Sequence, residues 1–93
     1  MTIALQPYKS TPVFDENTLP QALQNVHRTK AGVWGLIRLI EGELKLTIME
    51  PHSEQALSSG QTAVVRPEQP HFVTPLGRIK MQIDFYDQPP IVD

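Results

Sequence analysis

Two adjacent β-type segments, residues 33–40 and 43–48, most strongly limit how this chain can fold. The first, VWGLIRLI, is almost continuously apolar and rich in β-branched residues, as expected of a strand that is buried on both faces. The second, ELKLTI, alternates strictly between polar and apolar side chains. Gly42 lies in the short connection between them, where a tight turn needs positive φ. The pattern predicts that the two segments form a β-hairpin.

Short strand-like segments continue through the rest of the chain, with turn signals at intervals of roughly 8–12 residues. The nine prolines are spread along the sequence, which is typical of punctuation between strands and not of a disordered tract. One turn of helix is expected over residues 19–23, with Thr18 as its N-cap and Pro20 in its first turn. The other strands are expected around residues 11–14, 55–57, 62–65, 72–74 and 78–86. These features predict an all-β sandwich or small barrel with minimal helix.

The length of 93 residues predicts a single domain, with residues 1–9 as an N-terminal arm and residues 88–93 as a loosely docked C-terminal tail. The net charge of -2 and the scattered basic residues argue against nucleic-acid binding. The absence of cysteine excludes disulfides, thiolate zinc sites and thiol nucleophiles. The N-terminus does not resemble a signal peptide, and no apolar run is long enough to span a membrane. We therefore expect a cytoplasmic protein.

The segment RPEQPHFV, residues 66–73, places two prolines directly ahead of a histidine. If His71 binds a metal ion, its ring must arrive at a fixed depth and angle, and Pro67 and Pro70 restrict the backbone that delivers it. In the simpler interpretation, the prolines end one strand and precede the next. His71 is then a hydrogen-bonded, partly buried side chain without a metal.

Two parts of the sequence resemble the cupin motifs: LIEGELKLTI resembles the end of the first, and GQTAVVRPEQPHFV resembles the second. Four segments together, YKSTPVFDENTLP, HRTKAGVWG, PEQPHFV and IDFY, are similar to a small single-domain family, the TehB/YeaR-like domain. This resemblance covers about residues 8–87. It implies a cupin-like β-barrel of the double-stranded β-helix or jelly-roll type, a homodimer and a possible metal site, without a firmly established reaction. No glycine-rich nucleotide loop is present, so S-adenosylmethionine chemistry is not implied.

The cupin resemblance makes His27 and His71 candidate ligands of one divalent metal ion. Zinc is the first expectation, with iron, manganese or nickel as alternatives. The first cupin motif normally supplies two histidines and a glutamate, but this chain offers only His27, which is otherwise an exposed histidine at a strand edge. Glu68 replaces the usual glycine of the second motif and either faces the same pocket or caps the turn.

Asp84 is the remaining candidate ligand, and its orientation depends on which face of residues 78–86 is buried. Apolar and polar side chains alternate there, so Asp84 lies on one side with Gln82, opposite an apolar stripe. If the stripe lines the barrel, Asp84 points to solvent. If the stripe packs against a second subunit, Asp84 and Gln82 face the pocket. The stripe expected to support a homodimer consists of Ile79, Met81, Ile83 and Phe85.

Arg28 and Lys30, close to His27 in the sequence, can hold a small anionic or organic ligand, although solvated charges are the commoner outcome. Trp34 is expected in the core or the pocket wall, with Gln82 as a further pocket residue, and His52 has no assigned role. Three functions remain open. The first is a metal-binding cupin, with a link to tellurite, nitrosative or oxidative stress that only the resemblance implies. The second is a metal-free module that binds or senses a small ligand, and the third is a structural partner domain.

Overall fold

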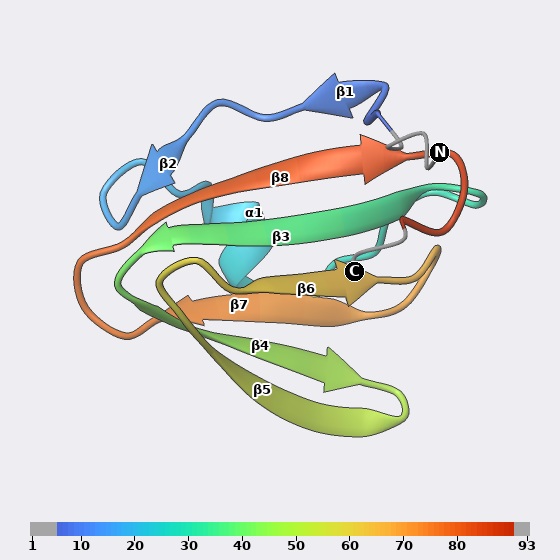
Figure 1. Ribbon diagram of the computed structural model, residues 1–93. Coiled ribbons are helices and arrows are strands. Elements are labelled where there is room, and N and C mark those ends of the chain that lie inside the picture. Colours follow the sequence, from blue (N-terminus) through green and yellow to red (C-terminus); the bar gives the residue numbers. More distant parts are fainter. Residues whose placement is uncertain (1–5, 91–93) are drawn as a thin grey trace.

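The structure, a computed structural model, describes residues 6–90 and contains two antiparallel sheets (Figure 1). The strands of the larger sheet follow the order β1-β8-β3-β6, and β2 also pairs with β8. They are β1 (Lys9–Ser10), β2 (Phe14–Asp15), β3 (Trp34–Glu41), β6 (Thr62–Val65) and β8 (Lys80–Tyr86). The smaller sheet has the order β5-β4-β7 and consists of β4 (Glu43–Met49), β5 (His52–Ser58) and β7 (His71–Pro75). The one helix in this part of the chain is α1 (Gln21–Gln24). The predicted all-β class with minimal helix is confirmed.

The predicted hairpin is wrong, because β3 and β4 belong to different sheets. β3 pairs with β6 and β8, whereas β4 pairs with β5 and β7. Gly42 has a φ of 93° and sits at the corner where the chain crosses from one sheet to the other. A Cβ atom added to it would lie 2.1 Å from the carbonyl oxygen of Arg78. The sequence pattern shows the strands and the turn, but a glycine with positive φ fits a sheet-to-sheet corner as well as a hairpin.

The two sheets share no strand, so the expected closed barrel is not formed. Within residues 6–90, β6 ends the larger sheet and β5 ends the smaller one, without a partner on their outer sides. A cleft of about 470 Å³ opens at this side of the sandwich and is lined from both sheets by residues that include Trp34, Leu46 and Gln55. β6 has only four residues and β5 has one buried residue, Leu57, so little side-chain burial is available to hold these two edges together.

The core fills the space between the sheets. It draws on inward side chains of β3, β4, β6, β7 and β8, on Leu57 of β5, and on Leu19 ahead of α1. The apolar stripe of β8 that was expected to support a dimer is part of this core: Ile79, Met81 and Ile83 are buried, and Phe85 packs against them. The stripe therefore cannot form an interface with a second subunit.

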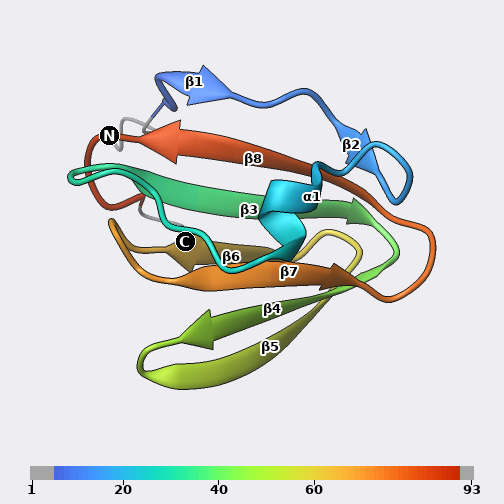
Figure 2. The ribbon, with the colours of Figure 1, turned by 180° about the vertical axis from the view of Figure 1, so that it is seen from behind.

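The segments before β3 also differ from expectation. Thr18 does not cap α1, whose N-cap position is Pro20 without a side-chain hydrogen bond. The Thr18 hydroxyl instead accepts a hydrogen bond from the backbone N–H of Asp15 at 2.8 Å. The expected N-terminal arm contributes β1, while residues 1–5 and 91–93 lie outside the described part of the chain. Figure 2 shows α1 on the side of the molecule opposite the view of Figure 1.

β5 was only partly predicted, because six of its seven residues, all except Leu57, are exposed and most of these are polar. Its pairing with β4 over the whole strand defines it where apolar patterning does not. No helix among the described residues is long and apolar enough to cross a membrane.

Candidate functional site

A cavity of about 400 Å³ lies between the larger sheet and the chain segment that leads from α1 into β3. Its apolar walls are formed by Leu23, Val33, Ile37, Val65, Ile83 and Phe85. Polar side chains of three kinds join them: the imidazoles of His27 and His71, the hydroxyl of Thr29, and basic groups. Its size falls within the range of small-molecule sites, so this cavity is the candidate functional site.

His27 and His71 lie side by side in this cavity, as the sequence analysis expected. Their backbones form a single antiparallel bridge, with N–H···O distances of 2.9 and 3.0 Å between the two residues. The ring centroids are 4.1 Å apart and the ring planes are tilted by 55°. The segment around His27 thus extends the smaller sheet beyond β7, and this pairing brings two residues that are distant in sequence into contact.

Both imidazoles are held in one orientation by backbone carbonyls. Nδ1 of His27 lies 2.9 Å from the carbonyl oxygen of Asn25, and Nδ1 of His71 lies 2.7 Å from that of Gln69. A carbonyl oxygen only accepts, so each Nδ1 carries the proton and the Nε2 of each neutral ring keeps its lone pair. Histidines that bind metals are commonly oriented in this way, and so are histidines that accept a hydrogen bond from a ligand.

Burial lowers the pKa of His71, the nearby His27 lowers it further, and the hydrogen bond to the Gln69 carbonyl opposes both effects. We therefore expect the domain to lose stability as the pH falls below the ordinary histidine value of 6.5. In that range the unfolded chain takes up a proton that the buried ring resists, while above it both states are neutral. Thermal unfolding followed from neutral pH to about pH 5 should show a smaller decrease in His71→Gln than in the parent protein. His52→Gln, at an exposed position on β5, is the control, and equal slopes in all three proteins would contradict this expectation.

The proline-framed turn explains how His71 is delivered. Gln69 closes the turn, since its backbone N–H donates to the carbonyl of Arg66 at 3.2 Å and its side-chain oxygen accepts from the Arg66 N–H at 3.3 Å. The backbone N–H of Glu68 donates to the carbonyl of Thr29 at 3.2 Å. The turn is therefore anchored to the same segment that carries His27, and it fixes both histidines relative to each other.

Glu68 does not join the histidine pair. It is exposed, it has a φ of 59°, and it is not among the residues that line the cavity. This left-handed conformation is one that glycine adopts more readily than a residue with a side chain. The structure thus assigns Glu68 to the turn, which was one of the two alternatives left open by the sequence.

Asp84 also lies away from the histidines, on the outer face of the sheet, which was one of the two orientations that the sequence left open. Its two neighbours on β8, Ile83 and Phe85, line the cavity, so the carboxylate points to the opposite face of the sheet. There one oxygen accepts from Nε of Arg38 at 2.8 Å, and the other accepts from the Ser10 hydroxyl at 2.7 Å.

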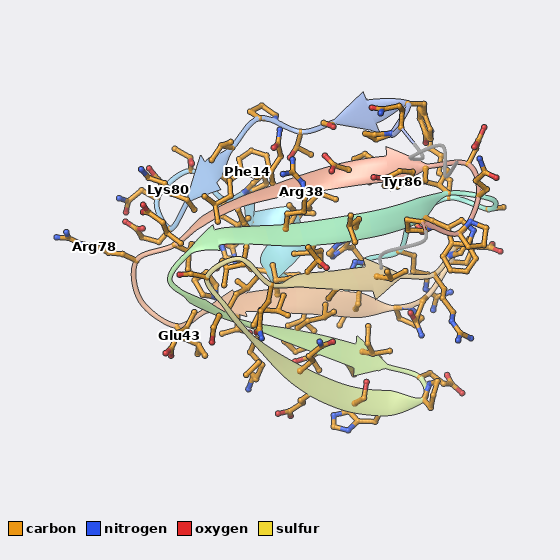
Figure 3. The ribbon with its side chains drawn as sticks, in the orientation of Figure 1. Phe14, Arg38, Glu43, Arg78, Lys80 and Tyr86 are labelled. Carbon is orange, nitrogen blue, oxygen red and sulfur yellow. The ribbon has the colours of Figure 1, made fainter. Side chains whose placement is uncertain are left out.

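Gln82 is on the same outer face as Asp84 and therefore does not line the pocket, contrary to expectation. Its side-chain oxygen accepts from Arg38, which Figure 3 shows beside β8, and its side-chain NH₂ donates to the carbonyl of Thr11 at 2.7 Å. The contact with Thr11 holds the segment that follows β1 against the larger sheet. Residues 6–90 contain no group of three or more His, Cys, Asp or Glu side chains that could hold a metal ion.

Arg28 and Lys30 line the cavity as predicted, whereas Trp34 lines the separate cleft between the open sheet edges. Tyr8 and Lys9 were not predicted as site residues, although they belong to the N-terminal arm and form part of the cavity wall. The arm is placed by pairing with β8, for example through the hydrogen bond from the Tyr8 N–H to the Phe85 carbonyl at 2.9 Å. No local sequence pattern predicts that this arm pairs with β8.

The TehB-like domain family matches residues 9–83, which span both sheets and the histidine pair. The chain belongs to this family. TehB-like segments are also found in two curated relatives from Haemophilus influenzae, each named a probable S-adenosyl-L-methionine-dependent methyltransferase TehB. They are 45% and 42% identical to this chain over 38 residues. The matched stretch is 41% of this chain and 13% of each relative.

Solved structures share the fold of this chain. The crystal structure of TehB from H. influenzae has a TM-score of 0.77 and 29% identity, over 86% of this chain and 30% of that chain. A crystal structure of a protein from E. coli (strain K12) has a TM-score of 0.80 and 25% identity, over 96% and 99% of the two chains. The crystal structure of FeII HppE has a TM-score of 0.63 at 22% identity, over 80% of this chain and 40% of that chain, a likeness of fold alone.

Proposed function

We propose that this domain binds a small anion in the cavity between its larger sheet and the segment that leads from α1 into β3. The observation that carries the proposal is the charge around the cavity. Lys9, Arg28 and Lys30 line it together with both histidines, and none of the described lining residues is acidic. The whole chain has a net charge of -2, so the positive surroundings of this cavity do not follow from composition.

The three basic side chains are exposed and available to a ligand. None of them forms an ion pair with another residue between positions 6 and 90, where the paired cations are Arg38, Lys45 and Lys80. A single exposed charge contributes little to binding, but several charges of one sign around a cleft with apolar walls concentrate the field on an incoming anion. We also propose that the domain is an open, cupin-like sandwich and that it acts in the cytoplasm. A role of the domain in tellurite resistance, or in the response to nitrosative or oxidative stress, is a further proposal that the family resemblance implies.

Removal of the basic side chains tests this function. Acetate and inorganic phosphate serve as probes in calorimetric or NMR titrations of the parent protein and of a variant with Arg28→Ala and Lys30→Ala. Each charge-assisted hydrogen bond contributes about 1.5–3 kcal/mol, so we expect the double variant to bind at least about tenfold more weakly.

Lys45→Ala is the matched control, because Lys45 lies on β4 outside the cavity and within 3.7 Å of Glu54. Binding should also weaken as salt is added. Absence of saturable binding of both probes to the parent protein, or equal loss in Lys45→Ala, would overturn the proposal.

Binding of a divalent cation by His27 and His71 is the second candidate. The orientation of both rings by Nδ1 favours it, and so does their 4.1 Å separation. Two imidazoles do not supply the three or four protein ligands of a zinc site, and the described residues offer no further ligand beside them. A cation would therefore need ligands from the bound molecule. Metal analysis of untagged protein addresses this candidate, and bound zinc that is lost in His71→Ala would support it.

A further inference from the structure

Gly35 makes a notch in the floor of the cavity. It lies on β3, between Phe85 of β8 and Val65 of β6, and all three residues line the cavity. The next inward position on β3 is Ile37, which pairs with Ile83. Because Gly35 has no side chain, the space between Phe85 and Val65 that a side chain would occupy stays empty.

Neither the backbone nor close packing requires glycine at this position. The φ of Gly35 is outside the left-handed region, and an added Cβ would have ordinary contacts of 3.8 Å with Cβ of Val65 and 3.9 Å with Cγ2 of Thr29. Gly42 differs in both respects, with its φ of 93° and its contact of 2.1 Å. Glycine in a strand weakens the strand, and it often marks a place where a ligand approaches the backbone closely. We take Gly35 as space that is kept open for a ligand.

Charge and burial change from the mouth of the cavity to its floor. Lys9, Arg28 and Lys30 are exposed, whereas Ile37 and Val65 at the floor are buried. The volume of about 400 Å³ also exceeds what an inorganic oxyanion fills. Such an ion occupies a few water volumes of about 30 Å³ each. The remaining space is bounded by apolar side chains.

From the notch and this gradient we infer that the ligand is an amphipathic organic acid. Its anionic group lies among the basic side chains at the mouth, and its apolar body extends over Gly35 between Phe85 and Val65. This inference rests on the proposed anion site and adds the ligand class to it. An inorganic oxyanion would pair with the basic side chains at the mouth of the cavity but would leave the apolar floor uncovered.

A series of straight-chain carboxylates tests the inference with the full chain. Acetate, butyrate and hexanoate present the same charged group to the mouth and differ only in apolar length. We expect affinity to rise along the series by up to about fourfold for each methylene that is buried. Arg28→Ala should weaken all three by a similar factor, because it acts on the shared carboxylate.

A side chain that fills the notch at Gly35 should remove the rise in affinity with carboxylate chain length. It should leave the contact between the carboxylate and the basic side chains intact. In Gly35→Val we expect hexanoate to lose most of its advantage over acetate, while acetate binds as before. Gly35→Ala, which the contacts accommodate without displacement, should give an intermediate loss and covers the case in which the valine variant fails to fold. Equal affinities of acetate and hexanoate for the parent protein would overturn the inference and leave the anion site standing. Absence of binding by all three carboxylates and by phosphate would overturn both.

Discussion

Replacement of Gly42 by alanine is expected to destabilise the domain by about 3 kcal/mol or more. The φ of 93° alone costs a residue with a Cβ about 1–2 kcal/mol. The new Cβ would also lie 2.1 Å from the carbonyl oxygen of Arg78, a backbone atom that cannot rotate away. Relief of this overlap means separating the β3–β4 corner from the connection that leads into β8, a strain of about 1–3 kcal/mol. For a domain of this size the midpoint of thermal unfolding should fall by about 15 °C or more.

Gly60→Ala separates the two causes. Gly60 has a similar φ of 86°, but no atom lies within 4 Å of the position that its Cβ would take. This control should therefore show only the conformational cost of about 1–2 kcal/mol. Similar losses in the two variants, measured by denaturant or thermal unfolding, would mean that the sheet-to-sheet corner is not packed as described. The side chain of Arg78 plays no part in this contact and extends away from the domain (Figure 3).

Leu44→Ala is the second substitution with a large expected effect. Leu44 is fully buried on the inner face of β4, where it pairs with Leu57 and Pro75 in the two neighbouring strands. Truncation of a buried leucine costs about 2–5 kcal/mol, because transfer energy is lost and a cavity remains. Leu76→Ala provides the matched control, since Leu76 is 49% exposed and should change stability by about 0.5 kcal/mol or less. A loss below about 1 kcal/mol for Leu44→Ala would contradict the position of the core.

The strands with strong side-chain periodicity could be predicted from sequence, but their partners could not. The buried run of β3 and the alternation in β4 and β8 identified these strands, because burial of one or both faces imposes the pattern directly. Which strands pair is decided by contacts between residues far apart in the chain. The corner at Gly42 shows the difference, since one glycine fits a hairpin and a crossing between sheets equally well.

The site could be predicted in part for the same reason. His71 attracted attention through its prolines, but its contact with His27 was expected only from a family resemblance. Asp84 could not be oriented until the packing of β8 against the core was known, and that packing turned the carboxylate toward Arg38 and Ser10. Lys9 entered the site through β1, a two-residue strand.

Gly35 is the residue for which a sequence signal existed and was not used. A glycine inside an otherwise apolar strand is a known sign of close approach by a ligand or another backbone. The continuous apolar run around Gly35 led to the prediction that both faces of this strand are buried. The cavity shows that one side of this strand is not filled by the chain itself.

Nitrogen spectra of ¹⁵N-labelled protein during titration with hexanoate test the central claim most directly. We expect saturable changes at the imidazole nitrogens of His27 and His71, and at the backbone amides of Arg28 and Lys30, with His52 on β5 unaffected. Changes that saturate at His52 but not at the histidine pair, or no saturable change at any histidine, would show that the cavity beside His27 and His71 is not the binding site.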